Sequence, residues 1–389
     1  MSEKLTPEQF EKKLKRAATN IIGAGPLPFP VTDTLKKILK YYLDEEEVLF
    51  IGKAFKTKKS LNMEQLVKKT KKEEKEIERI CENLAQKGFI FNQPSSTGIM
   101  VYRLLPLVVI GAFEYTFMRD IPNEKKEELA ELAKWYETLM TELRDAIQGA
   151  YDNFLPIFKS QPPVDRTVPI YDNVGGEEIP IEHVVEDVGE KIMPAKTVKE
   201  IIEKFEDIAV GNCFCRNYQK MLGHECEMNA PMEVCFTFGK SARHVVNQGF
   251  ARAIDKEEAL KLLKQAEDAG LVHKAFHNKS NIMKEENSIC NCCRDCCDTF
   301  MLWKKGATPM VNSTNFMSKV NIDGCTGCGT CEENCPVGAI VVGDEDVAIV
   351  DENICIGCGV CAHFCPENTI SLLEGESRTV FIPPPKLKT

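Results

Sequence analysis

Eight cysteines between residues 325 and 365 repeat one pattern twice, C-x2-C-x2-C-x3-C-P. Three thiolates at two-residue gaps fit one face of an iron–sulfur cube, and the fourth cysteine, which precedes a proline, ligates the other cube in such double runs. The pattern therefore predicts two [4Fe–4S] clusters with crossed ligands. One cluster is expected on Cys325, Cys328, Cys331 and Cys365, and the other on Cys355, Cys358, Cys361 and Cys335.

Glycines alternate with these cysteines at Gly327, Gly329, Gly357 and Gly359, where they allow tight turns that aim backbone N–H groups at sulfur. The stretch from about Ser318 to Leu373 resembles a bacterial-type two-cluster ferredoxin domain, and all eight ligand positions match. The resemblance implies low-potential, one-electron transfer between adjacent cubanes. Disulfides would require an oxidising compartment, and two zinc sites would not account for the C-x3-C-P ends.

A second group of cysteines lies upstream of this repeat. This group has nine cysteines. Because four thiolates satisfy one cluster, nine cysteines would hold two clusters with one thiol to spare, or one cluster with extra thiols nearby. Neighbouring side chains diverge in most backbones, so either each adjacent pair splits between two sites or the cluster is not a simple cubane. We expect one or two additional iron–sulfur clusters, with zinc held by four thiolates as the alternative. The candidate ligands are Cys213, Cys215, Cys226, Cys235, Cys290, Cys292, Cys293, Cys296 and Cys297.

The region between the two halves of this group has an ordinary helical pattern from Asp255, a candidate N-cap, to Gly270, a candidate C-cap. Arg216 follows Cys215 and is a candidate donor to a cluster sulfur, whereas the nearby histidines fit structural roles better than ligand roles. From about Val210 to Leu373 the arrangement resembles a group of larger 4Fe–4S proteins from anaerobic bacteria and archaea. That resemblance implies electron transfer and assigns no reaction.

Composition limits the remaining possibilities. The chain has 389 residues, enough for two or three domains, and a net charge of −10 that argues against bulk nucleic-acid binding. Its first residues are charged and have no apolar export segment, and the longest apolar run, 104–113, is about half a membrane span. We therefore expect a cytoplasmic protein without a membrane span, rich in cysteine for metal or redox chemistry. Because exposed cubanes are oxygen-labile, an anaerobic host is expected.

Residues 30–105 show three helical patterns followed by two alternating runs around "PSSTG", which predict a β-hairpin. This order resembles a winged helix-turn-helix domain. Lysines and arginines outnumber glutamates between 53 and 79, but the third helix carries glutamates in its N-terminal half, where such domains approach bases. Nucleic acid is therefore not expected to be a partner.

An amphipathic helix is expected over 124–149, and the prolines of 154–170 predict a linker or an extended crossing strand. The expected fold class is α+β. We expect a winged-helix-like domain over 1–105, a long helix and proline-rich linker over 106–180, a central α/β cysteine-rich domain over 181–317, and a ferredoxin-like dicluster domain with a tail over 318–389.

Together these features favour an iron–sulfur electron-transfer protein, a subunit of or donor to an anaerobic oxidoreductase complex, whose partners would be redox proteins. Two alternatives stay open. The upstream cysteines could build an active-site cluster, which would make the protein a reductase, or cluster loss could alter a winged-helix grip on DNA, which would make it a redox-sensing transcription factor. Whether the protein is itself an enzyme is left open, as are its catalytic residues and its oligomeric state.

Overall fold

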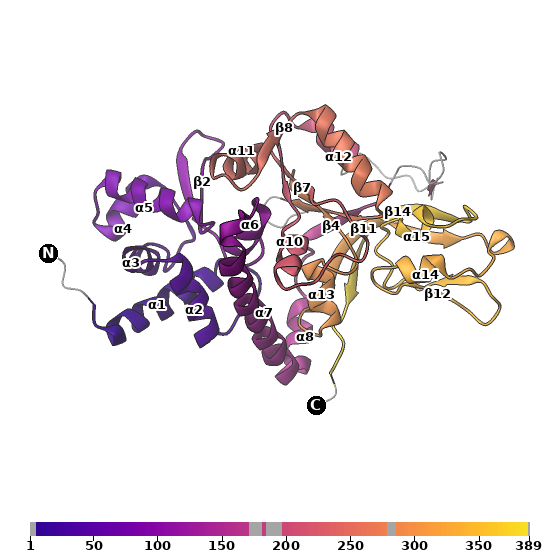
Figure 1. The fold of residues 1–389 in the computed structure, drawn as a ribbon, viewed down its shortest axis with the longest axis horizontal. Helices are drawn as coiled ribbons and strands as arrows, with labels where there is room; N and C mark the ends of the chain where they lie inside the picture. The colour runs from indigo at the N-terminus through magenta and orange to yellow at the C-terminus, as the bar shows by residue number, and fades with distance from the viewer. Residues whose placement is uncertain (1–4, 171–180, 184–196, 278–284, 388–389) are drawn as a thin grey trace. The chain divides into compact units, whose positions relative to one another are not determined.

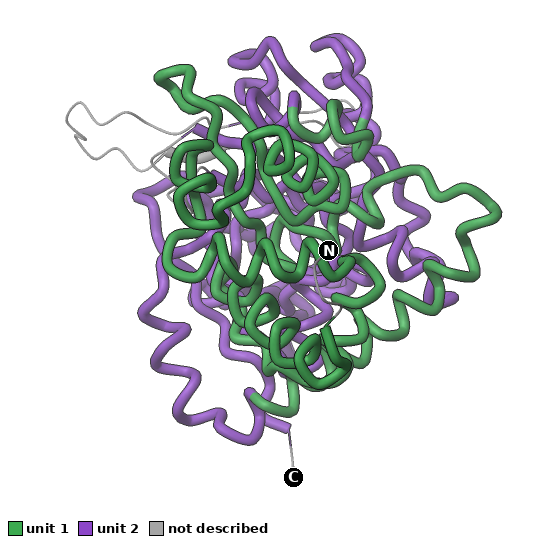
Figure 2. The backbone as a smooth tube through the Cα atoms, turned by 90° about the vertical axis from the view of Figure 1, so that its left-hand side faces the viewer, with its two compact units in different colours: residues 1–146, 244–251 green, residues 147–243, 252–389 purple. Residues whose placement is uncertain are grey.

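The computed structural model describes residues 5–170, 181–183, 197–277 and 285–387. The chain divides into two compact units, which Figure 2 shows in green and purple. Unit 1 comprises residues 1–146 and 244–251, and unit 2 comprises residues 147–243 and 252–389. Within the described ranges, no helix has the length and apolar character needed to cross a membrane.

Unit 1 is mainly helical, and its helices begin at well-formed caps. Thr6, Asp44 and Asn62 each accept a hydrogen bond from the backbone N–H three residues later, which satisfies an otherwise unpaired donor. The elements in chain order are α1 (Pro7–Ile22), α2 (Asp33–Tyr42), α3 (Glu45–Ala54), β1 (Ser60–Leu61), α4 (Met63–Thr70), α5 (Glu74–Gln86), β2 (Ile90–Pro94), β3 (Met100–Leu104), α6 (Ala112–Met118), the short 3-10 helix Asn123–Lys125 and α7 (Lys126–Gly149), whose last residues belong to unit 2.

The hairpin predicted between 89 and 105 is confirmed, since β2 and β3 pair antiparallel from Ile90 opposite Leu104 to Pro94 opposite Met100. Strand β1 completes a three-stranded sheet in the order β1-β3-β2. The helix expected over 124–149 is also present as α7. Residues 30–105 hold four helices where the sequence pattern predicted three, because α3 has an apolar surface on most sides and lacks a clear stripe.

Unit 2 is built on a mixed sheet in the order β5-β14-β11-β4-β9-β10-β7-β6-β8, counting only strands of the described residues. Its strands are β4 (Asp165–Val168), β5 (Ile181–His183), β6 (Ile208–Asn212), β7 (Glu233–Phe238), β8 (Arg252–Ile254), β9 (Val272–His277), β10 (Glu286–Cys292), β11 (Met310–Val320) and β14 (Ile370–Ile382). Its longer helices are α8 (Tyr151–Lys159), α9 (Val198–Lys204), α10 (Phe214–Met221), α11 (Gly239–Asn247), which ends in unit 1, α12 (Lys256–Asp268) and α13 (Asp298–Lys304).

Two of these elements test expectations from the sequence. Helix α12 starts where the cap pattern predicted, with Asp255 accepting a hydrogen bond from the Glu258 N–H at 2.8 Å. The proline-rich stretch forms helix α8, with Pro156 inside it, before the extended strand β4. Strand β4 agrees with the expected extended strand, whereas α8 is a helix where the prolines suggested a linker.

Alternation along the strands divides the buried side chains of unit 2 between the two faces of the sheet. On one face, α9 and α12 contribute Ile201, Ile202 and Leu263 to a cluster with Phe236 of β7 and Ile289 of β10. We call this the α12 face. On the other face, Val272 of β9 and Cys292 of β10 belong to a second cluster, which continues into the C-terminal cysteines.

The C-terminal cysteine repeat lies between two adjacent strands of this sheet. Strands β11 and β14 pair antiparallel up to Val320 opposite Ile370, and the chain between these two residues forms a separate lobe (Figure 1). The lobe contains the 3-10 helix Ile322–Gly324, α14 (Thr330–Asn334), β12 (Ile340–Val342), β13 (Ala348–Val350) and α15 (Val360–His363). The expected α+β class, with strands and helices mixed, is thus observed.

Candidate iron–sulfur and metal centres

The first predicted cluster set surrounds a hollow in the C-terminal lobe. The hollow contains about 320 Å³ of space, part of it open to solvent. It is lined by cysteines from both copies of the repeat, with Cys365 of the second copy facing the three of the first. The cysteines that line it are Cys325, Cys328, Cys331 and Cys365. This arrangement is the one required by crossed ligation.

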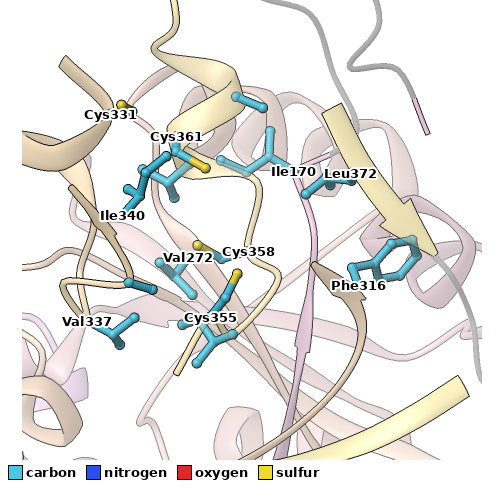
Figure 3. Packing of buried hydrophobic residues seen from close by; sticks show 14 of the residues in the cluster. Ile170, Val272, Phe316, Cys331, Val337, Ile340, Cys355, Cys358, Cys361 and Leu372 are labelled. Atoms are coloured by element: carbon cyan, nitrogen blue, oxygen red, sulfur yellow. The ribbon is translucent and has the colours of Figure 1, made fainter. Parts of the chain in front are cut away.

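The second predicted set is also brought together, at the more buried end of the lobe. The thiols of Cys361, Cys335 and Cys355 are close enough to Cys358 to raise its pKa, in addition to the larger effect of burial. In Figure 3 the sulfurs of Cys355 and Cys358 lie beside each other, below Cys361. The hydroxyl of Ser318 is 3.0 Å from the Cys361 sulfur and 3.9 Å from the Cys355 sulfur. The structure thus brings these four thiols near one another.

The turns that carry these cysteines depend on glycine at two positions. Gly327 and Gly357 have φ angles of +65° and +64°, in the left-handed region that glycine favours. A Cβ atom at Gly357 would lie 2.2 Å from the Phe316 carbonyl oxygen, and one at Gly327 would lie 2.3 Å from that of Asp346. Any side chain at either position would therefore displace the neighbouring backbone and move the adjacent cysteines.

Two backbone N–H groups outside the glycine turns point at cysteine sulfurs. The Ala339 N–H lies 3.2 Å from the sulfur of Cys335, and the Ala348 N–H lies 3.4 Å from that of Cys325. Burial raises the pKa of the Cys361 thiol to about 12. Because burial without a cation disfavours thiolate, the chemistry of these donor sets fits a group that carries its own positive charge, such as an iron–sulfur core.

The upstream cysteines separate according to the face of the sheet on which they lie. Cys290 and Cys292 project from β10 on the same side, two residues apart, and belong to the cluster that contains the C-terminal cysteines. Cys293 and Cys296 belong to a different cluster on the α12 face, with Ala266 of α12. Cys297 returns to the first side. Each adjacent pair therefore splits between two sites, which was one of the two alternatives left open by the sequence.

On the side of the C-terminal lobe, successive thiol contacts link five cysteines. Hydrogen bonds from Cys215 and Cys292 lower the pKa of Cys297. A contact with Cys290 raises the pKa of Cys292, and a contact with Cys235 raises the pKa of Cys290. We call Cys215, Cys297, Cys292, Cys290 and Cys235 the thiol row. Cys213 contacts its Cys215 end.

On the α12 face, three thiols and a carboxylate form a tighter group. The ligand atoms of Cys226, Cys293, Asp295 and Cys296 all lie within 4.8 Å of one another. Cys226 comes from the loop between α10 and β7, and the other three come from the loop between β10 and α13. We call this group the compact thiol site. The structure thus brings all nine upstream cysteines into one region but not into one site.

Two functional candidates were not expected from the sequence. Lys274 is directly opposite Cys290 in the pairing of β9 with β10, and its ammonium group bonds Asp165 at 2.8 Å. Both side chains are buried, and although burial alone would lower the pKa of Lys274, Asp165, Cys292 and Cys297 raise it overall. Asp295 was overlooked within "CCRDCC", although a carboxylate between paired cysteines is itself a ligand signal.

Arg216 and the nearby histidines are the remaining candidates from the sequence. Arg216 is buried and donates to the carbonyls of Pro231 and Asn291, and it contacts Cys293 of the compact thiol site. His273 pairs with Asn291 through its Nδ1, and His244 belongs to unit 1. These positions agree with structural roles for the two histidines.

Comparison with known proteins identifies one part of the chain. Residues 324–370 match the family model of the 4Fe-4S dicluster domain. A probable ferredoxin from Methanosarcina thermophila is 50% identical over 38 residues, which are 10% of this chain and 66% of that relative. The chain thus spans slightly less than two thirds of the relative's length. No solved structure matches the chain. The C-terminal lobe of this chain thus contains a 4Fe-4S dicluster domain.

Proposed function

We propose that the protein is an iron–sulfur electron-transfer component that serves, as a subunit or as a donor, an anaerobic oxidoreductase complex. The observation that carries the proposal is the hollow lined by Cys325, Cys328, Cys331 and Cys365, which joins ligands from both copies of the repeat. Cys335, Cys355 and Cys361 lie near Cys358, which supports a second four-thiolate set in the same lobe. Bound cubanes would supply reversible one-electron transfer.

The chain's own residues would position and tune these clusters. Backbone N–H groups directed at sulfur, such as that of Ala339, stabilise added negative charge, and the Ser318 hydroxyl does the same at the second set. Cys328 is the exposed member of the first set, whereas the second set has three buried cysteines and the half-buried Cys335. We therefore infer that the set containing Cys328 exchanges electrons with an external partner and the second set exchanges them internally.

A third cluster is proposed on the thiol row. Cys290, Cys292 and Cys297 share one buried cluster of side chains with Cys355 and Cys358, so a centre on the row would continue the path from the second set. Cys215, Cys290, Cys292 and Cys297 are the four candidate ligands, since they are consecutive in the chain of thiol contacts. Cys213 and Cys235, at the two ends of the contacts, would be neighbours of the cluster.

The order of elements from α3 to β3 supports a winged-helix assignment for the N-terminal unit, which we keep as a proposal. Some basic residues of this unit form ion pairs. The Glu46 carboxylate is 2.5 Å from the Arg79 guanidinium and 3.4 Å from the Lys72 ammonium group. These pairs reduce the positive field that DNA binding needs. We therefore infer that this unit serves in docking a protein partner.

Iron and acid-labile sulfide, measured per chain on protein purified without air, test the function. At four irons per cubane, about twelve irons are expected, and about eight would mean that only the dicluster domain is loaded. Replacing Cys292 with serine should remove about four irons and leave the paramagnetic signals of the dicluster domain, while Cys81→Ser, a buried thiol in α5, should remove none. Colourless protein with no low-temperature signal after dithionite would refute the proposal.

A further inference from the structure

The compact thiol site differs in its spacing from the sets assigned to cubanes. Its four ligand atoms all lie within 4.8 Å of one another. Among the described residues, no other group of three or more histidine, cysteine or acidic side chains brings its ligand atoms this close together. In a cube, by contrast, four iron atoms stand between the thiolates, so the ligands of a cubane are expected to lie farther apart than this. Around one tetrahedral zinc, with Zn–S bonds of about 2.3 Å, neighbouring sulfurs lie only about 3.8 Å apart.

Thiol hydrogen bonds connect the members of the site, and a bound metal ion would replace the thiol protons. The thiols of Cys296 and Cys226 donate to the Asp295 carboxylate at 3.2 Å and 3.5 Å. The thiols of Cys226 and Cys296 also contact the sulfur of Cys293. The four ligand atoms thus lie close enough together to surround one tetrahedral ion.

Charge at the site also calls for a cation. Cys293 and Cys296 are 1% and 0% exposed, and the Asp295 side chain is 7% exposed. Three thiolates and a carboxylate would place four negative charges in this buried space, and Arg216 is the cation that contacts Cys293. A divalent ion would neutralise two more charges and make the site tolerable in a low-dielectric environment.

We propose that Cys226, Cys293, Cys296 and Asp295 hold a single tetrahedral zinc ion, separate from the iron–sulfur clusters. Thiolate sulfur combined with oxygen or nitrogen suits zinc, which also binds such sites more tightly than ferrous iron does. The imidazole Nε2 of His224 lies 3.5 Å from Asp295 Oδ2, and the Glu227 N–H donates to the same oxygen at 2.8 Å. These two groups would orient the carboxylate toward the ion.

The ion would join two loops that carry the thiol row. The α10–β7 loop contains Cys226 and follows the helix of Cys215, while Cys293 and Cys296 lie between Cys292 and Cys297. By fixing these loops on the α12 face, zinc would hold Cys215, Cys292 and Cys297 in place on the other face. Its role is therefore structural, and it shares no ligand with the proposed third cluster.

Metal analysis of the full chain, purified without air, tests the site separately from the iron count. About one zinc per chain is expected, and absorption fine structure at the zinc edge should show three sulfurs at about 2.3 Å and one oxygen or nitrogen at about 2.0–2.2 Å. The Cys226→Ser variant should lose the zinc while retaining the dicluster signals. Asp295→Asn should weaken zinc binding at least roughly tenfold. Cys235→Ser, a thiol on the other face, is the matched control and should retain zinc.

Three results would overturn the proposal. One is anaerobic protein that contains its full iron but no zinc, and another is zinc that remains in a Cys226→Ser/Cys293→Ser variant. The third is loss of iron rather than zinc from Cys226→Ser, which would make the compact thiol site a ligand set for iron. Since the zinc-edge measurement uses the unmodified chain, misfolding of a variant does not leave the question open. Failure of the electron-transfer proposal would instead appear in the iron count and the paramagnetic signals.

Discussion

Cys292 and Cys293 are consecutive in the chain, yet their side chains belong to two different buried clusters on opposite faces of one sheet. Cys292 is the last residue of β10, so the two-residue period of the strand decides the side of each thiol. Cys296 and Cys297 are also divided between the two clusters: Cys296 lies with Cys293 on the α12 face, and Cys297 lies with Cys292 on the other face. Two sets of ligands with different spacing are thus encoded in eight residues.

The crossed assignment of ligands can be tested with two hydroxyl groups. The Ser318 hydroxyl lies 3.0 Å from Cys361, in the second set, and the Thr369 hydroxyl lies 3.4 Å from Cys365, in the first. A hydroxyl near a cluster sulfur favours the reduced state, so Ser318→Ala and Thr369→Val should each lower the potential of a different cluster, by roughly tens of millivolts. Redox titration followed by paramagnetic resonance measures both. If both variants shifted the same cluster, the crossing would be wrong.

Gly357 is expected to be irreplaceable. Its φ is +64°, and the Cβ of an alanine would lie only 2.2 Å from the Phe316 oxygen, so Gly357→Ala strains the turn that carries Cys355 and Cys358. We expect loss of about four irons per chain from the second set. Gly375→Ala, where a Cβ would meet nothing within 4 Å, is the control and should leave the iron content unchanged.

Lys274 should raise the potential of a cluster on the thiol row. Its positive charge, near Cys292 and Cys297, favours the added electron. Replacing the ion pair in the variant Lys274→Met/Asp165→Asn avoids leaving Asp165 buried and unpaired, an outcome that costs about 3–5 kcal/mol. Asp165 also acts on Cys297, whereas Lys274 acts on Cys292 and Cys297, so loss of the carboxylate offsets only part of the loss of the ammonium group. The potential of the upstream cluster should fall by roughly tens of millivolts at an effective dielectric constant near 20.

Two comparisons make that experiment specific. Lys274→Arg retains the charge and should leave the potential nearly unchanged, whereas the potentials of the dicluster domain should not move in any of these variants. An unchanged upstream potential in the double variant would remove Lys274 from the electrostatics of the thiol row. Redox titration of the upstream signal provides the measurement.

Unit 1 should lose stability in mild acid because of His244. Burial among Phe91, Tyr115 and Phe250, together with the nearby charge of Arg103, lowers the pKa of His244 to about 4 from 6.5. Between these values the unfolded chain binds a proton that the folded unit does not. The free energy of unfolding therefore falls as pH drops from 6.5 towards 4, by about 3 kcal/mol at most.

The measurement can be confined to unit 1, because Trp135 lies in unit 1 and Trp303 lies in unit 2. In a Trp303→Phe background, urea unfolding followed by tryptophan fluorescence at pH 7 and pH 5 reports on Trp135. Adding His244→Phe should flatten the dependence over this range. A slope that persists in that variant would assign the effect to other groups.

The sequence predicted the features that depend on local pattern. Cysteine spacing predicted the dicluster domain, and alternation around "PSSTG" predicted the hairpin of β2 and β3. It did not predict the grouping of the upstream cysteines, because Cys226 and Cys293 meet only through the pairing of β7 with β10. Lys274 was missed for the same reason, since its relation to Cys290 depends on strand register.

The position of the dicluster lobe between β11 and β14 makes it a detachable cassette. Because Val320 and Ile370 are paired neighbours, the ends of the cassette are close enough for a short turn to replace it and leave a plain hairpin. Two covalent attachments also prevent the lobe from swinging as a singly tethered carrier would. An electron carrier that moves between distant partners would gain little from attachment at both ends. A carrier that stays in place would gain a constant electron-tunnelling distance between its clusters and the rest of unit 2.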